Sequence, residues 1–153
     1  MPRMQAWENW LAVLASHGFA AHAMTRPGAS EQDIAAFSAK TGVHGELLDL
    51  YRLSDGQLEP WRSELPGATD LFPCARFVPL AEALELWQDW QEPRVPFTLD
   101  AGGESLAVSL SGEVVDMETG TVMAATLVAY LERLATSALE ISDDDGVLTW
   151  DVC

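Results

Sequence analysis

The side chains best suited to holding a metal or attacking a substrate are three histidines and two cysteines. His17 and His22 are five residues apart, a spacing that points them to different sides of a helix, and His44 pairs with neither. Cys74 and Cys153 form no spacing motif, and we expect two unrelated thiols rather than a disulfide framework. The sequence therefore indicates no metal site.

The acidic stretch SDDDG at 142–146 invites a test for calcium binding. Placing Gly146 at the glycine of an EF-hand loop puts Ile141 at the first ligand position and Val152 at the last, where oxygen ligands are required. A turn is the better interpretation. The segment AGGES matches neither nucleotide-binding glycine motif, and the chain contains no GxSxG nucleophile motif. With 24 acidic residues present, no single pair of carboxylates is informative. We therefore predict a protein that is not an enzyme and uses no cofactor.

Composition favours one globular domain spanning residues 1–153. Hydrophobic residues make up 48% of the chain and charged residues 21%, which is typical of a folded protein. No apolar run reaches the length of a membrane span, and Glu8 and Asn9 interrupt the N-terminal apolar segment, which predicts an amphipathic helix rather than a signal peptide. We expect a cytoplasmic protein with no membrane association.

Charge is the most pronounced global property, with 8 basic residues against 24 acidic ones and a net charge of −16. From Val95 onward the only base is Arg133, against eleven acids. Such a field repels phosphate backbones and attracts basic partners, so we expect no direct nucleic-acid binding. Solubility alone and the steering of a basic partner are both compatible with this charge.

Two helices in the first third of the chain carry clear boundary signals. Ser30 is expected to cap a helix over EQDIAAFSAKTG, and Gly42 stands where the helix should end. A second short helix, about Glu46 to Leu53, runs into Asp55-Gly56-Gln57. The segment LEPWRSELPGATDLFPC then has the composition of a long surface loop.

The rest of the chain alternates between helical and strand-like patterns. A helix over LAEALELWQDWQE carries only acidic charges on its polar face, with no lysine or arginine between them. The runs PFTLD, SLAVSL, EVVDM and TVMAA then predict a small antiparallel meander. A helix over TLVAYLERLATSAL follows, and the tail, about 140–153, is compatible with a β-hairpin around Asp145-Gly146. These elements predict an α+β fold, with a small, mainly antiparallel sheet packed against several helices.

The order of these segments resembles the SMI1/KNR4 family, within the wider SUKH superfamily. The resemblance rests on RPGASEQDIAAFSAKTGVHGELLDLYRLSDGQ, on LFPCARFVPLAEALELWQDW and on the late helix TLVAYLERL. The chain departs from the pattern at His44-Gly45, where many relatives have Leu-Pro. Bacterial members of the family are largely immunity proteins that bind a cognate toxin, and fungal relatives regulate cell-wall synthesis through protein contacts. The resemblance implies a protein-binding module without catalytic residues.

From these observations we predict an immunity-type protein that binds and neutralises a toxin with a basic surface, such as a nuclease. A regulatory scaffold with a non-toxin partner is the first alternative, and a small enzyme or ligand-binding protein is the second. Asp55 and Gly56 are assigned to a helix-ending turn. The predicted partner contacts are Gln57, Glu59, Trp61, Glu64, Asp70, Glu85, Asp89 and Glu92. The toxin's identity and the oligomeric state stay open.

Overall fold

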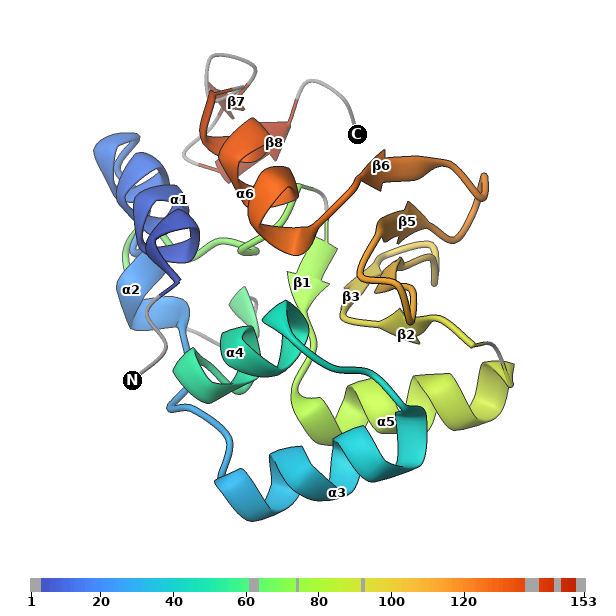
Figure 1. Cartoon of the computed structure of the whole chain (residues 1–153). Coiled ribbons are helices and arrows are strands. Elements are labelled where there is room, and N and C mark those ends of the chain that lie inside the picture. Colours follow the sequence, from blue (N-terminus) through green and yellow to red (C-terminus); the bar gives the residue numbers. More distant parts are fainter. Residues whose placement is uncertain are drawn as a thin grey trace.

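The computed structural model describes residues 4–60, 64–73, 75–91 and 93–136, together with the strands at 141–144 and 147–150 (Figure 1). Its helices are α1 (Gln5–Ser16), α2 (Ala21–Met24), α3 (Glu31–Thr41), α4 (Glu46–Leu53), α5 (Leu80–Trp90) and α6 (Leu127–Thr136). Its strands are β1 (Ala75–Phe77), β2 (Val95–Pro96), β3 (Thr98–Asp100), β4 (Leu106–Val108), β5 (Val114–Asp116), β6 (Val122–Ala124), β7 (Ile141–Asp144) and β8 (Val147–Trp150).

The strands form small antiparallel sheets, which confirms the α+β fold predicted from the sequence. β2, β4, β5 and β6 make a four-stranded sheet in that order, and β1 pairs with β3. β7 pairs with β8 in the tail, where the sequence favours a hairpin. Figure 1 shows α3 beside α5 at one end of the molecule and α1 beside α6 at another, with the four-stranded sheet at one side.

The run PFTLD does not form the single strand expected of it. β2 and β3 belong to different sheets, and Phe97 stands between them. Its backbone N–H donates to the carbonyl of Leu106 at 3.0 Å, while its carbonyl accepts from the N–H of Val78 at 3.1 Å. The Phe97 side chain is fully buried. One short segment therefore joins the two sheets around a core aromatic.

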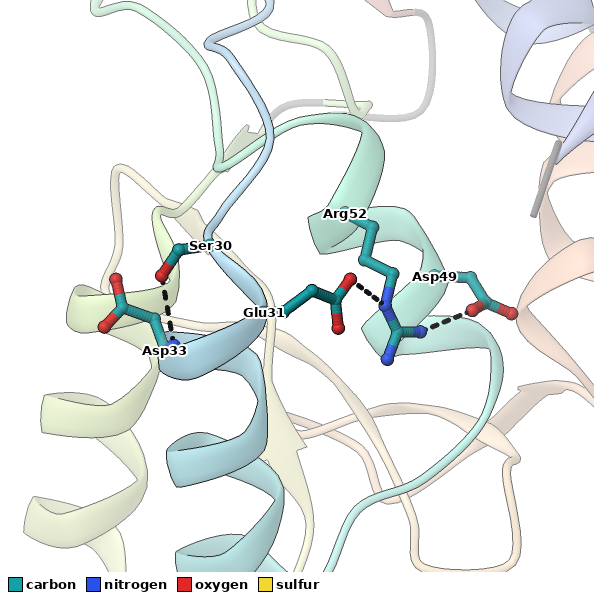
Figure 2. A network of polar contacts seen from close by, with 5 residues as sticks. All are labelled: Ser30, Glu31, Asp33, Asp49 and Arg52. Atoms are coloured by element: carbon teal, nitrogen blue, oxygen red, sulfur yellow. Dashed lines mark hydrogen bonds and ion pairs between the residues drawn. The ribbon is translucent and has the colours of Figure 1, made fainter. Parts of the chain in front are cut away.

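The boundaries of α3 agree with the sequence prediction. The Ser30 hydroxyl accepts a hydrogen bond from the backbone N–H of Asp33 at 3.1 Å, and Gly42 ends the helix at a φ of 78°. Figure 2 shows how α3 is tied to α4: the Arg52 guanidinium lies between Glu31, at 2.8 Å, and Asp49, at 2.7 Å. These contacts fix the helix pair that precedes the Asp55-Gly56 turn.

The hydrophobic core is centred on aromatic rings. Phe72 contacts Phe77 and Phe97 edge to face, with ring centroids 5.7 Å and 5.4 Å away, and it stacks on Trp7 at 5.9 Å. Trp10 of α1 is fully buried, and its indole N–H donates to the carbonyl of Leu71 at 2.8 Å. The segment expected to be a long surface loop is therefore not wholly external, because Leu71 and Phe72 near its end enter the core.

Candidate functional site

The Asp55-Gly56 turn joins the end of α4 to the start of α5. The Asp55 carboxylate accepts a hydrogen bond from the backbone N–H of Leu80 at 2.7 Å, placing a negative charge at the positive end of α5. Gly56 has a φ of 78°, and a Cβ at this position would lie 2.5 Å from the backbone nitrogen of Pro79. Only glycine fits a left-handed conformation pressed so closely against another backbone segment. Both residues thus hold the fold together at this point.

Gln57 has a similar internal role, and its side chain is only 5% exposed. Its Oε1 accepts hydrogen bonds from the backbone N–H groups of Leu71, at 2.9 Å, and Phe77, at 2.7 Å. Its Nε2 donates to the carbonyl of Leu58 and to the carboxylate of Asp70, both at 3.1 Å. The amide is occupied on both sides, so its hydrogen bonds serve the fold, and a partner contact at Gln57 stays a prediction.

Asp70 lies behind Gln57 and is half-buried. Burial raises the pKa of its carboxyl group above the ordinary value, while the hydrogen bond from Gln57 and the positive charge of Arg76 oppose that shift. Asp70 thus orients the Gln57 amide more than it presents charge to a partner.

An open cleft lies in front of this network, with a volume of about 780 Å³. Two leucines on its wall are unusually exposed for large apolar side chains: Leu58 by 41% and Leu65 by 39%. We call this feature the loop cleft. Its lining residues are Arg26, Gln57, Leu58, Glu59, Glu64, Leu65, Arg76, Pro79 and Glu82.

Charges of both signs surround the two leucines. Arg76 of β1 forms a two-point ion pair with Glu82 of α5, with Nη1 lying 2.9 Å from Oε1 and Nη2 contacting Oε2. The hydrogen bond to Glu82 raises the pKa of the Arg76 guanidinium, and the charge of Glu59 adds to the effect. The cleft therefore combines an exposed apolar pair with a charged rim, the composition typical of a protein-binding surface.

The structure brings some of the predicted contact residues together and separates others. Glu59 and Glu64 line the loop cleft. Glu85 and Asp89 are exposed on α5 but do not line the cleft, whereas Glu82 of the same helix does. Trp61 and Glu92 lie outside the described residues.

The apolar and basic residues of the cleft are not among those predicted from the sequence. Leu58 and Leu65 stand in a polar, proline-containing segment, and that isolation was a usable signal. Arg26 and Arg76 come from distant parts of the chain, so sequence alone gives no reason to group them with the loop.

No protein-family model matches the chain, and no curated protein matches it either.

Within the described part of the chain, no cluster of three or more histidines, cysteines or acids is placed to hold a metal ion. No described helix combines the length and the apolar character that crossing a membrane would require. The loop cleft is accordingly the feature on which a functional proposal can be based.

Proposed function

We propose that this chain is an immunity-type binding protein of the SMI1/KNR4 kind, which occludes a toxin domain in the cytoplasm. The observation that carries the proposal is the loop cleft, where Leu58 and Leu65 are 41% and 39% exposed beside the charged residues Glu59 and Glu64. A monomeric protein gains nothing in stability from leaving two leucines of one cleft in water, whereas a partner that covers them gains apolar burial.

The network behind the cleft supports a binding role. Gln57 holds Leu71 and Phe77 through two hydrogen bonds to one oxygen, and Asp55 holds the start of α5. A surface held in place by such hydrogen bonds loses little conformational freedom when a partner binds. We therefore expect the cleft to be largely preformed in the free protein.

The charge of the protein supports a basic partner. A net charge of −16 accelerates encounter with a positively charged domain, and rim acids such as Glu59 and Glu64 help to orient it. Apolar burial at the leucines then supplies most of the affinity, because solvent-exposed ion pairs contribute little. A basic toxin such as a nuclease fits both conditions.

Co-expression with the toxin-like product of a neighbouring gene tests this proposal. The wild-type protein should suppress toxicity, and the double variant Leu58→Asp/Leu65→Asp should lose that suppression. Leu110→Asp is the matched control, because Leu110 is 57% exposed and does not line the cleft. Circular dichroism and urea unfolding verify that each variant is folded.

The outcomes separate the possible roles. Protection by the wild type and Leu110→Asp but not by the double variant supports the proposal. Full protection by the double variant would show that the partner binds at a surface other than the loop cleft. Failure of the wild type to protect, together with stoichiometric binding of a non-toxic host protein, favours the regulatory scaffold instead.

A further inference from the structure

A second concave region lies where two acidic turns meet at one end of the four-stranded sheet. The first turn connects β3 to β4 and the second follows β5. Leu106 pairs with Asp116 across β4 and β5, and the backbone N–H of Met117 donates to the carbonyl of Ser105 at 3.0 Å. The two turns help to line an open concavity of about 650 Å³, which we call the acidic hollow.

Four carboxylates line the acidic hollow: Asp100, Glu104, Asp116 and Glu118. Two of them are held by their own turns. Oδ1 of Asp100 accepts from the N–H groups of Gly102, at 2.8 Å, and Glu104, at 2.9 Å, and Oδ1 of Asp116 accepts from the N–H of Glu118 at 2.9 Å. Among the residues that the structure describes, no lysine, arginine or histidine lines the hollow. A concave wall of one sign concentrates negative potential.

Arg133 of α6 lies close to the acidic hollow without entering its lining. Its guanidinium donates to the carbonyl of Met123, a lining residue, and its charge acts on the Tyr130 hydroxyl in opposition to that of Asp116. One exposed arginine therefore offsets part of the charge of four acids and leaves the hollow negative.

The buried hydroxyl group of Ser105 provides an independent observation. Ser105 lines the hollow and is only 4% exposed, yet its hydroxyl has no hydrogen-bond partner in the described part of the chain. Tyr130 also lines the hollow and is 6% exposed. A buried hydroxyl without a partner is costly, and a bound donor group would remove that cost.

We propose that the acidic hollow binds an organic cation: a guanidinium or alkylammonium group carried on a short apolar chain. Such a group donates several hydrogen bonds at once, which suits carboxylates spread around a wall and hydroxyl oxygens beside them. The apolar part of the ligand would pack on Leu106 and Met123, which also line the hollow. The cation can come from a free small molecule or from a basic side chain of a partner protein. This inference does not depend on the function proposed for the loop cleft.

Nuclear magnetic resonance of the 15N-labelled full chain tests the proposal with two probes at low ionic strength. Agmatine presents a guanidinium as a free small molecule, and the capped peptide acetyl-Gly-Arg-Gly-amide presents it as a side chain. We expect saturable shifts of the amide signals of residues 100–106 and 116–118. Glu104→Gln/Glu118→Gln should weaken binding about fivefold, and Tyr130→Phe should weaken it about twofold, as expected for the loss of exposed ion pairs and of one hydrogen bond.

The double variant Glu8→Gln/Glu132→Gln is the matched control, because it removes the same charge from two exposed helical positions outside the hollow. It should bind both probes as the wild type does. Tighter binding of agmatine supports a free cation as the ligand, and tighter binding of the peptide supports a side chain. Shifts that do not saturate, or equal weakening in the control, would overturn the proposal by showing diffuse attraction to an acidic protein.

Discussion

The loop cleft and the acidic hollow are both open, and both are lined by carboxylates, but their charges are arranged differently. In the loop cleft Glu82 is paired with Arg76, and the Gln57 amide behind them has partners on both sides. In the acidic hollow four acids share the wall without a basic lining residue among those described, and the Ser105 hydroxyl lacks a partner there.

The difference shows that net charge alone does not define a binding surface. A chain with a charge of −16 contains one region where polar groups already satisfy one another and apolar side chains are exposed. It contains another where four carboxylates share a wall with no basic lining residue among those described, and where the Ser105 hydroxyl has no partner there. We expect the first region to bind through apolar burial and the second through ionic hydrogen bonds.

The largest effect on stability is expected at Gln57. Gln57→Ala leaves the buried N–H groups of Leu71 and Phe77 without their acceptor, and each such loss costs on the order of 1–3 kcal/mol. We expect the free energy of unfolding in urea to fall by about 3 kcal/mol. Gln88→Ala on the exposed side of α5 is the control and should change it by less than about 0.5 kcal/mol. Equal effects of the two substitutions would contradict the internal role of Gln57.

Paired charges at the surface should give an intermediate effect. Arg52→Met removes the contacts to Glu31 and Asp49 shown in Figure 2, and the Glu31 side chain is 74% exposed. We expect a loss of at most about 1 kcal/mol in unfolding free energy, diminishing at high salt. A loss that persists in molar salt would show that Arg52 acts through packing of its aliphatic chain.

Removing charge from the acidic hollow should raise the unfolding free energy, whereas the two preceding substitutions lower it. Glu104→Gln/Glu118→Gln relieves repulsion among the four acids, so we expect a gain of about 0.5 kcal/mol in unfolding free energy at low salt. The gain should vanish at high salt and exceed that of Glu8→Gln/Glu132→Gln. A loss of stability would mean that the hollow is internally compensated like the loop cleft.

The smallest effect is expected at Asp70, and it depends on pH. The pKa of Asp70 is raised in the folded protein above its ordinary value of 3.8, so the folded state binds the proton more tightly than the unfolded state. This carboxyl group therefore contributes less to stability as pH rises from 3.8 through the folded pKa. Asp70→Asn keeps an acceptor for Gln57 and removes the titration.

The measurement is the difference in unfolding free energy between Asp70→Asn and wild type at pH 4 and pH 7. The variant should gain relative to wild type at the higher pH. A difference that stays constant between the two values would contradict the raised pKa.

Local signals in the sequence were sufficient for parts of this structure. Ser30 and Gly42 bound α3 as predicted, because a capping hydroxyl and a left-handed glycine act within one turn of the helix. The α+β fold followed from alternating strand patterns and helical periodicity in the same way.

Features that depend on distant partners could not be predicted. Gln57 bonds to Leu71 and Phe77, 14 and 20 residues away, and Asp55 bonds to Leu80, 25 residues away. Nothing in the tetrapeptide SDGQ indicates those contacts, so the sequence places Gln57 at the surface. The isolation of Leu58 and Leu65 in a polar segment indicated exposure, but only the fold places both leucines on the wall of one cleft.

The most direct test of the proposed function is the affinity of the purified protein for any toxin domain that a neighbouring gene is found to encode, measured by calorimetry. We expect Leu58→Asp/Leu65→Asp to weaken binding about 100-fold or more, as the loss of a central apolar contact does at other interfaces, while Leu110→Asp changes it by less than about threefold. Undiminished binding by the Leu58→Asp/Leu65→Asp variant would contradict the assignment of the loop cleft as the partner-binding surface.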